Sequence, residues 1–201
     1  VRDPFNRHIG YSDPDWVYGF LNTIRYKNFE LFIGIDGREG GIAQSRTIRN
    51  MYWSGVHPET VNPFRAASSR GVSNYVADGV VVVDGDVEYD TDGNIINDTR
   101  EYEENTQVVN YEDYMTTYHS NAYSNHYYDM TFIKLREVSL SYNFPSKTLE
   151  NTFLKQASVS LIGRNLAVWS KVDYIDPDSG TDLSLQTPSM RNFGIHFNAK
   201  F

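Results

Sequence analysis

Histidine has the widest chemical range of the residue types in this chain, because imidazole binds metals and transfers protons near neutral pH. The five histidines are His8, His57, His119, His126 and His196. None lies in an H-E-x-x-H metal motif, and the chain has no G-x-S-x-G nucleophile motif. His119 and His126 are seven residues apart in a polar stretch, where solvated side chains are expected rather than a metal pair. The sequence therefore predicts no enzyme, no catalytic residue, no metal and no cofactor.

Two acidic segments place oxygen ligands at short spacing, which is what calcium requires. In the first, Asp90-x-Asp92-Gly93-Asn94, the sixth position is Ile95, where an EF-hand loop needs glycine. A hairpin turn is therefore expected there, with calcium as the weaker alternative. The second group consists of Asp173, Asp176 and Asp178. A calcium site is a somewhat stronger alternative for this group, and both alternatives stay open at this stage.

Two further stretches could bind ligands. Residues 37–41 (Gly-Arg-Glu-Gly-Gly) lack the Lys-Ser/Thr of a phosphate loop, so the end of a strand is the better interpretation. A polar stretch rich in tyrosine contains Tyr102, Tyr111, Tyr114, Tyr118, Tyr123, Tyr127 and Tyr128. Tyrosine offers a flat apolar ring with a hydrogen-bonding tip, which suits sugars, but loop-against-loop packing explains these residues equally well. The substrate-binding residues therefore stay unknown.

The last nine residues show the clearest pattern of local structure. The apolar residues of this stretch alternate with Gly194, His196, Asn198 and Lys200; they are Phe193, Ile195, Phe197, Ala199 and Phe201. Since successive side chains of a strand point to opposite faces, the stretch has one apolar and one polar face. The wall of a membrane barrel has this pattern, with lipid outside and water inside. We therefore predict that the apolar set faces lipid and forms an assembly signal, and that His196 faces the lumen.

Four more strands are expected from alternation and turn signals. They cover residues 16–26, 29–37, 131–144 and 157–169, before a closing strand at 190–201. Lys27-Asn28 joins the first two as a short turn. The apolar parity changes in the third strand near Arg136, which indicates a bulge, and in the fourth strand near Gly163. The expected fold is all-β, with about five antiparallel strands of a large transmembrane barrel.

Long connections separate these strands. Residues 38–129 are expected to be a long extracellular loop, and residues 170–188 a second loop. Within the first loop, residues 42–53 suggest a short helix, and residues 79–96 suggest a small hairpin outside the main sheet. A loop of this length argues against a compact soluble domain but is ordinary in a large barrel.

Composition restricts the functional classes without choosing one. The chain has 201 residues, a net charge of −8 and no cysteine, so the positive charge of a nucleic-acid binder is missing. The mean hydropathy is −0.51, but alternating barrel strands escape such averages. The first residues, Val1-Arg-Asp-Pro, do not form a signal peptide, so we expect a mature chain or, more readily, a fragment of a longer protein.

Five segments in order resemble the SusC/RagA family of TonB-dependent outer-membrane transporters of Bacteroidota. The first is the pair of strands around Tyr26-Lys-Asn-Phe29. Phe132-Ile-Lys-Leu-Arg-Glu-Val-Ser-Leu-Ser-Tyr142 resembles the family's F-x-[KR]-L-R-x-V-x-L-x-Y strand, and Gly163-Arg-Asn-Leu166 its G-x-N-L strand. Tyr174-Ile-Asp-Pro-Asp178 resembles the Y-x-D-P-E loop, with aspartate at the last position, and residues 188–201 resemble the closing strand. Each motif is weak by itself, but their order along nearly the whole chain is specific.

The resemblance implies a barrel of about 22 strands with a plug, of which residues 1–201 would form the C-terminal part. It also implies import of oligosaccharides or peptides across the Gram-negative outer membrane. The implied partners are a SusD-like surface lipoprotein, the TonB complex through an N-terminal part, and the outer-membrane assembly machinery. A soluble, secreted β-rich module that binds glycans is the alternative. It would use the same aromatic residues as a core and a binding platform.

Overall fold

The computed structural model describes residues 5–179 and 189–201, which form two compact units. We call Gly10–Thr47 together with Tyr127–Phe201 the sheet unit. We call Val1–Ile9 together with Ile48–His126 the loop unit. Residues 1–4, and residues 180–188 of the expected loop 170–188, lie outside the described part. None of the helices in the described residues has the length and apolar character needed to cross a membrane.

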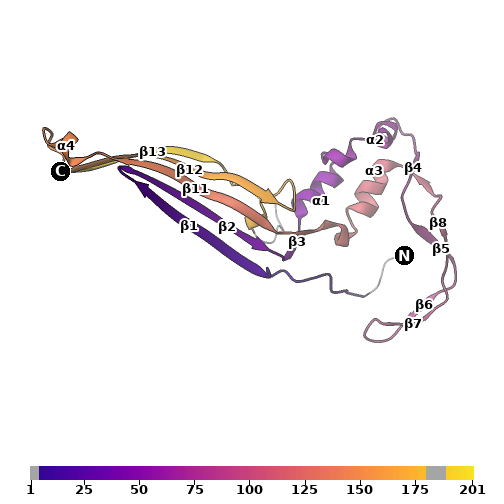
Figure 1. Cartoon of the computed structure of the whole chain (residues 1–201). Coiled ribbons are helices and arrows are strands. Elements are labelled where there is room, and N and C mark those ends of the chain that lie inside the picture. Colours follow the sequence, from indigo (N-terminus) through magenta and orange to yellow (C-terminus); the bar gives the residue numbers. More distant parts are fainter. Residues whose placement is uncertain (1–4, 180–188) are drawn as a thin grey trace. The chain divides into compact units, whose positions relative to one another are not determined.

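The sheet unit is built on one open antiparallel sheet of five long strands (Figure 1). Its strands are β1 (Trp16–Tyr26), β2 (Phe29–Glu39), β11 (Phe132–Asn143), β12 (Gln156–Ser170) and β13 (Asn192–Lys200). Their order in the sheet is β1-β2-β11-β12-β13, so β1 and β13 are its two edges. The expected set of five antiparallel strands is confirmed. β2 continues two residues past its expected end at Gly37, because Arg38 still pairs with Val17 of β1.

A two-residue turn fixes the register of the first hairpin. Tyr26 pairs with Phe29, and Lys27 between them has φ 53°, in the left-handed region that tight hairpin turns use. Register in a hairpin follows from the turn, and a slip of one residue would move every side chain to the other face. This turn therefore sets which residues of β1 and β2 share a face.

The expected change of parity occurs on β11, whereas β12 is irregular at the expected place but keeps its parity, because Ala167 and Trp169 follow Leu161 and Gly163 on the same face. On β11, Leu135 pairs with Ile35 while Glu137 pairs with Gly34, so Arg136 is an extra residue. On β12, the partners jump from Ala167 to Arg164 over the same step of β11. Asn165 in the skipped segment has φ 52°, and a side chain at Gly163 would run into Leu166. The bulge keeps Leu135 of β11 on the same face as Val138, whereas on β12 Val168 pairs with Lys134 and lies on the other face.

Short elements complete the sheet unit. β3 (Ile42–Gln44) pairs with β10 (Tyr127–Asp129), and the helix α4 (Ser146–Leu149) lies between β11 and β12. The 3-10 turn η4 (Pro177–Ser179) follows β12. The helix expected over residues 42–53 is confirmed for Arg46–Trp53 and is wrong for the residues before it. β3 takes its first residues, because they find a strand partner in β10, and the helix α1 (Arg46–Trp53) begins after it.

The loop unit is a small packed body rather than an irregular loop. It contains α1 from Ile48 onward, η1 (Pro58–Thr60), α2 (Pro63–Ser68), α3 (Tyr111–Asp113), the π-helix η2 (Tyr114–His119) and η3 (Tyr123–His126). Its core includes the buried residues Ile48, Ala67, Tyr111 and Met115. The side chain of Asn62 caps α2 by accepting from Arg65 N, and that of Asn110 caps α3 by accepting from Glu112 N.

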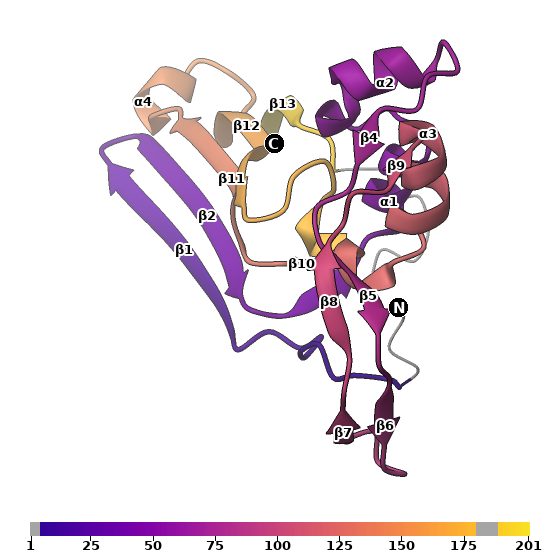
Figure 2. The ribbon, with the colours of Figure 1, turned by 90° about the vertical axis from the view of Figure 1, so that its right-hand side faces the viewer.

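A long interrupted hairpin extends from these helices (Figure 2). Its three ladders are nested: β4 (Tyr75–Val76) with β9 (Val108–Val109), β5 (Val80–Asp84) with β8 (Glu101–Glu104), and β6 (Val87–Tyr89) with β7 (Ile95–Asp98). The expected hairpin is confirmed at the tip. There the Asp90 carboxylate accepts hydrogen bonds from Asp92 N, Asn94 N and Asn94 Nδ2. These oxygens build the turn that connects β6 and β7.

Candidate functional site

One face of the five-stranded sheet is apolar across all of its strands. The ladders align Ile24, Leu31, Leu140, Leu161 and Ile195 in a single row from β1 to β13. A second row, two pairs further along the ladders, consists of Tyr26, Phe29, Tyr142, Val159 and Phe197. Four residues of the first row are between 44% and 65% exposed. Soluble monomers rarely expose a contiguous apolar face of this extent, so it needs an apolar environment.

The residues predicted to face lipid lie on this apolar face. Phe193, Ile195, Phe197 and Ala199 pair in turn with Gly163, Leu161, Val159 and Ala157 of β12. Phe193 and Phe197 are 79% and 74% exposed. Phe201 follows the end of β13, and its ring stacks on Phe153 with the centroids 5.5 Å apart. Whether this face contacts lipid is a matter for the proposal below.

The opposite face of the sheet is mostly polar. The row adjacent to the first apolar row contains Arg25, Glu30, Ser141, Ser160 and His196. Arg25 Nε lies 2.6 Å from Glu30 Oε2, and the hydroxyls of Ser141 and Ser160 are 2.8 Å apart. His196 is on this face together with hydroxyls and charged groups, whereas the preceding residue, Ile195, is on the apolar face. The two faces of the sheet therefore suit two different solvents.

A cluster of charges joins the polar face to the loop after β12. Lys134 Nζ lies 2.5 Å from Asp176 Oδ1 and 3.3 Å from Asp178 Oδ2. Arg136 Nη1 is 2.6 Å from Asp178, while its Nε and Nη2 bind both oxygens of Asp36. The guanidinium–Asp36 pair is bidentate, the geometry that arginine favours with carboxylates. We call these five residues the charge cluster.

The charge cluster is shielded from water at its centre. Lys134 is 3% exposed, and the neighbouring ring of Phe132 is 4% exposed. The cationic groups of Arg38, Lys134 and Arg136 lie 5.9, 5.4 and 5.9 Å from the centroid of this ring. A buried ammonium is tolerated only where carboxylates and aromatic faces surround it. The loop after β12 is therefore held down by ion pairs that are partly desolvated.

The aspartates of this loop are more acidic than usual. Burial acts to raise the pKa of Asp176, but hydrogen bonds from Lys134 and Ser189 outweigh it and lower the pKa to about 2. The hydrogen bond from Arg136 lowers the pKa of Asp178. These carboxylates already neutralise cationic side chains, which explains their spacing without calcium. Within residues 5–179 and 189–201, no group of three or more histidines or acidic residues could hold a metal ion.

The charge cluster was not anticipated from the sequence, although a signal was present. Lys134 and Arg136 are two residues apart on a strand, so alternation places both on the polar face. Cations close together on a strand need counterions, and the loop Asp173-Tyr-Ile-Asp-Pro-Asp178 supplies carboxylates in sequence. The cations of the strand, Lys134 and Arg136, thus form ion pairs with the carboxylates of the loop, Asp176 and Asp178.

The expectation that His119 and His126 are solvated is wrong. His126 is fully buried, and its ring centroid lies 5.4 Å from that of His119. The ring of Tyr52 stacks on His57 at 4.0 Å and contacts His119 at 4.5 Å. The Tyr52 hydroxyl donates to the Glu59 carboxylate. These contacts come from residues about 60 positions earlier in the chain, so local polarity could not reveal them.

The buried histidines predict that acid destabilises the loop unit. Burial lowers the pKa of both His119 and His126, and it outweighs the opposing effects of the Glu59 charge on His119 and of the hydrogen bond between His126 and the His119 carbonyl. The unfolded chain therefore binds protons first as the pH falls below about 6.5, and stability falls with it. Hydrogen exchange of residues 48–126 in the complete protein, corrected for intrinsic rates, should be faster at pH 5.5 than at pH 7.5.

The control for this pH effect is His196→Gln, because His196 lies on the exposed strand β13. This variant should keep the full pH dependence of hydrogen exchange in residues 48–126. Exchange that is equally slow at both pH values would contradict the prediction. It would mean that His119 and His126 bind protons as readily in the folded protein as in the unfolded chain.

The tyrosine-rich stretch divides into two groups. The rings of Tyr111 and Tyr114 both lie 5.0 Å from the ring of Tyr75, so these residues pack inside the loop unit. Burial raises the pKa of the Tyr75 phenol at this contact. Tyr118 and Tyr123 are 62% and 55% exposed and remain accessible to a partner or substrate. Packing therefore explains Tyr111 and Tyr114, while contact of Tyr118 and Tyr123 with a partner or substrate stays a prediction.

Comparisons with known proteins show which proteins this chain is similar to. The chain matches no protein-family model. It is 25% identical over 170 residues to TonB-dependent receptor P26 of Formosa agariphila, covering 85% of this chain and 14% of that protein. It is 23% identical over 206 residues to TonB-dependent receptor P3 of the same organism, covering 96% of this chain and 17% of the relative.

Solved structures agree on the fold. A chain of the RagAB peptide importer in its closed-closed state matches with a TM-score of 0.55 and 15% identity, over 95% of this chain and 18% of that chain. The open-open state matches with a TM-score of 0.55 and 16% identity, over 94% and 17%. The resemblance to TonB-dependent transporters of the SusC/RagA type is thus confirmed. The present chain spans less than a fifth of the length of each of these proteins.

Proposed function

We propose that residues 1–201 are the C-terminal part of the barrel of a TonB-dependent transporter in the Gram-negative outer membrane. The observation that carries this proposal is the exposed apolar face, which extends over all five strands opposite a polar face with the charge cluster. A membrane barrel needs lipid-facing apolar residues outside and tolerates polar residues only toward its lumen. Phe193, Ile195, Phe197, Ala199 and Phe201 would face lipid.

The two unpaired edges of the sheet support the proposal that it is one part of a barrel, which further strands close. β1 and β13 each pair on one side only within the described residues, and unpaired backbone groups are not tolerated in hydrocarbon. The short turn at Lys27-Asn28 and the connection between β11 and β12 lie at the same end of the sheet. Barrels have short turns at the periplasmic end. Residues 38–129 and 170–188 would therefore be extracellular.

The similarities also suggest cargo and partners. The relatives are named TonB-dependent receptors, and the structural match is the RagAB peptide importer. We propose that the complete protein imports oligosaccharides or peptides together with a SusD-like surface lipoprotein. The TonB complex would act through the N-terminal part of the complete protein. The outer-membrane assembly machinery would recognise the strand that ends at Phe201.

Uptake by cells that carry the complete protein tests this function. Fluorescently labelled pools of oligosaccharides and of short peptides are offered to cells with and without a working TonB. We expect accumulation of at least one pool, dependent on both the protein and TonB. Uptake that continues without TonB, or recovery of the protein only in soluble fractions, would contradict the proposal.

A further inference from the structure

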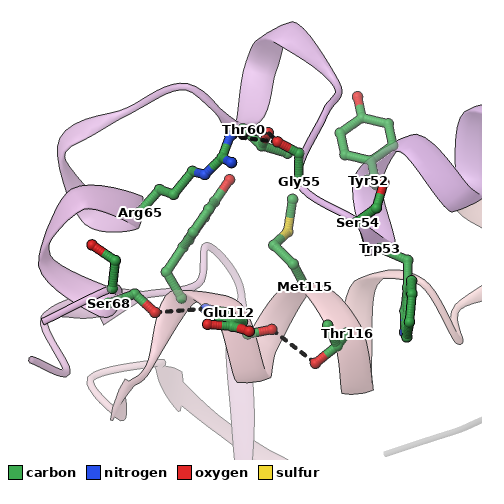
Figure 3. A pocket seen from close by; sticks show the side chains of 12 residues that line it. Tyr52, Trp53, Ser54, Gly55, Thr60, Arg65, Ser68, Glu112, Met115 and Thr116 are labelled. Carbon is green, nitrogen blue, oxygen red and sulfur yellow. Dashed lines mark hydrogen bonds between the residues drawn. The ribbon is translucent and has the colours of Figure 1, made fainter. Parts of the chain in front are cut away.

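A pocket of about 250 Å³ opens between the helices of the loop unit (Figure 3). α1 and the segment after it contribute Trp53 and Gly55, α2 contributes Arg65, and α3 with η2 contributes Glu112 and Met115. Met115 is buried, whereas Trp53 is 57% exposed. Sites for drug-sized molecules are usually larger, about 300–1,000 Å³. The pocket therefore fits a ligand that is smaller than a drug-sized molecule.

The hydroxyl groups around the pocket are already engaged inside the protein. Ser54 donates to Asn50 O at 2.7 Å, and Thr60 donates to His57 O at 2.6 Å. Thr116 donates to Glu112 O at 2.8 Å, and Ser69 donates to Ala66 O at 3.1 Å. A sugar ring needs several hydroxyl partners, and these residues have used their donors on carbonyls. Apart from Tyr111, whose hydroxyl accepts from Asn62 Nδ2 at 3.0 Å, the hydroxyls of the lining have little donor capacity left for a neutral sugar.

Two charged groups of opposite sign keep free hydrogen-bonding capacity. Arg65 Nη1 donates to Gly55 O, and the rest of the guanidinium lies flat over Gly55, 3.4 Å from where a side chain would begin. Among the described residues, Arg65 Nε and Nη2 have no hydrogen-bond partner, and the Glu112 carboxylate has none either. Gly55 is essential to this arrangement, since its φ of +70° favours glycine and its backbone contacts the guanidinium.

We propose that this pocket binds a very short peptide whose terminal ammonium and terminal carboxylate are both free. Arg65 would bind the carboxylate through its two remaining N–H groups, and Glu112 would accept from the ammonium. An apolar side chain of the peptide would contact Met115 and the indole of Trp53. The inference rests on the proposed import function and narrows its cargo to peptides.

Glu112→Gln is the decisive variant, because it keeps the size of an exposed side chain and removes only its charge. The probe is the tripeptide Ala-Leu-Ala, compared with its N-acetylated form and its C-terminal amide by calorimetric titration of the complete protein in detergent. Asp113→Asn is the matched control, since Asp113 is the neighbouring exposed carboxylate and does not line the pocket. Arg65→Lys is a second variant, which loses the fork of N–H donors.

We expect Glu112→Gln to weaken binding of the free tripeptide roughly tenfold or more, the effect of one lost charged hydrogen bond. It should leave binding of the N-acetylated form unchanged, while Arg65→Lys should leave binding of the amide unchanged. Asp113→Asn should have no effect. No binding by the unaltered protein, equal binding of all three probes, or displacement of the tripeptide by maltotriose would overturn the inference. TonB-dependent uptake, measured in parallel, shows whether the import function stands regardless.

Discussion

Replacing Lys134 with methionine should lower the unfolding free energy of the complete protein by about 3–5 kcal/mol. Methionine matches the length of lysine but cannot neutralise Asp176, whose side chain is 8% exposed. Removing one partner of a buried ion pair leaves the other charge desolvated and unpaired, which is the main part of the cost. Urea unfolding of the protein folded into lipid vesicles measures this difference.

Lys171→Met is the matched control for this prediction. Lys171 Nζ lies 2.8 Å from Asp129, but the two side chains are 58% and 41% exposed. An exposed pair of this kind contributes far less, because water screens it. Equal losses in the two variants would show that the charge cluster is as solvated as a surface pair and does not anchor the loop after β12.

Ile195→Arg should lower the unfolding free energy of the complete protein by about 2–4 kcal/mol if the residue lies near the bilayer midplane. Ile195 is near the middle of strand β13, at the end of the first apolar row beside Leu161, and is 65% exposed in this chain. A guanidinium at that position would have to enter hydrocarbon or distort the bilayer. The yield of folded complete protein in outer membranes, measured by its resistance to unfolding in cold detergent, reports the effect.

His196→Arg provides the comparison for the same strand. His196 is the next residue, on the polar face, so an arginine there would point into the proposed lumen. We expect nearly normal yield for this variant. If both arginine variants assemble equally well, the apolar face does not contact lipid, and the barrel interpretation fails with it.

The strands could be predicted because their signals are local. Alternation in residues 193–201 and the two-residue turn at Lys27-Asn28 depend on neighbouring residues only, and the structure has β13 and the β1–β2 hairpin at these places. The change of parity near Arg136 also followed from the order of apolar residues, and the ladder is irregular at that residue. The period of a strand is short, so a single extra residue is visible in the sequence.

The site contacts could not be predicted in the same way, because they join distant segments. Asp36 and Arg136 are 100 residues apart, and the buried histidines contact Tyr52 across more than half of the loop unit. The polar composition of residues 97–128 suggested an irregular loop. The folded structure buries Tyr111 and Met115 from this stretch against helices α1 and α2, which supply apolar partners that local composition does not show.

The most direct test of the central claim compares adjacent positions of β13 in the membrane. Residues Ile195, Phe197, His196 and Asn198 are replaced by cysteine one at a time in a cysteine-free form of the complete protein, and each is spin-labelled. Collision rates with oxygen, which dissolves in lipid, and with a water-soluble nickel chelate are then measured. The account predicts lipid contact at 195 and 197 and water contact at 196 and 198. Labels at 195 and 197 that neither reagent reaches would mean a packed protein interior, and would contradict it.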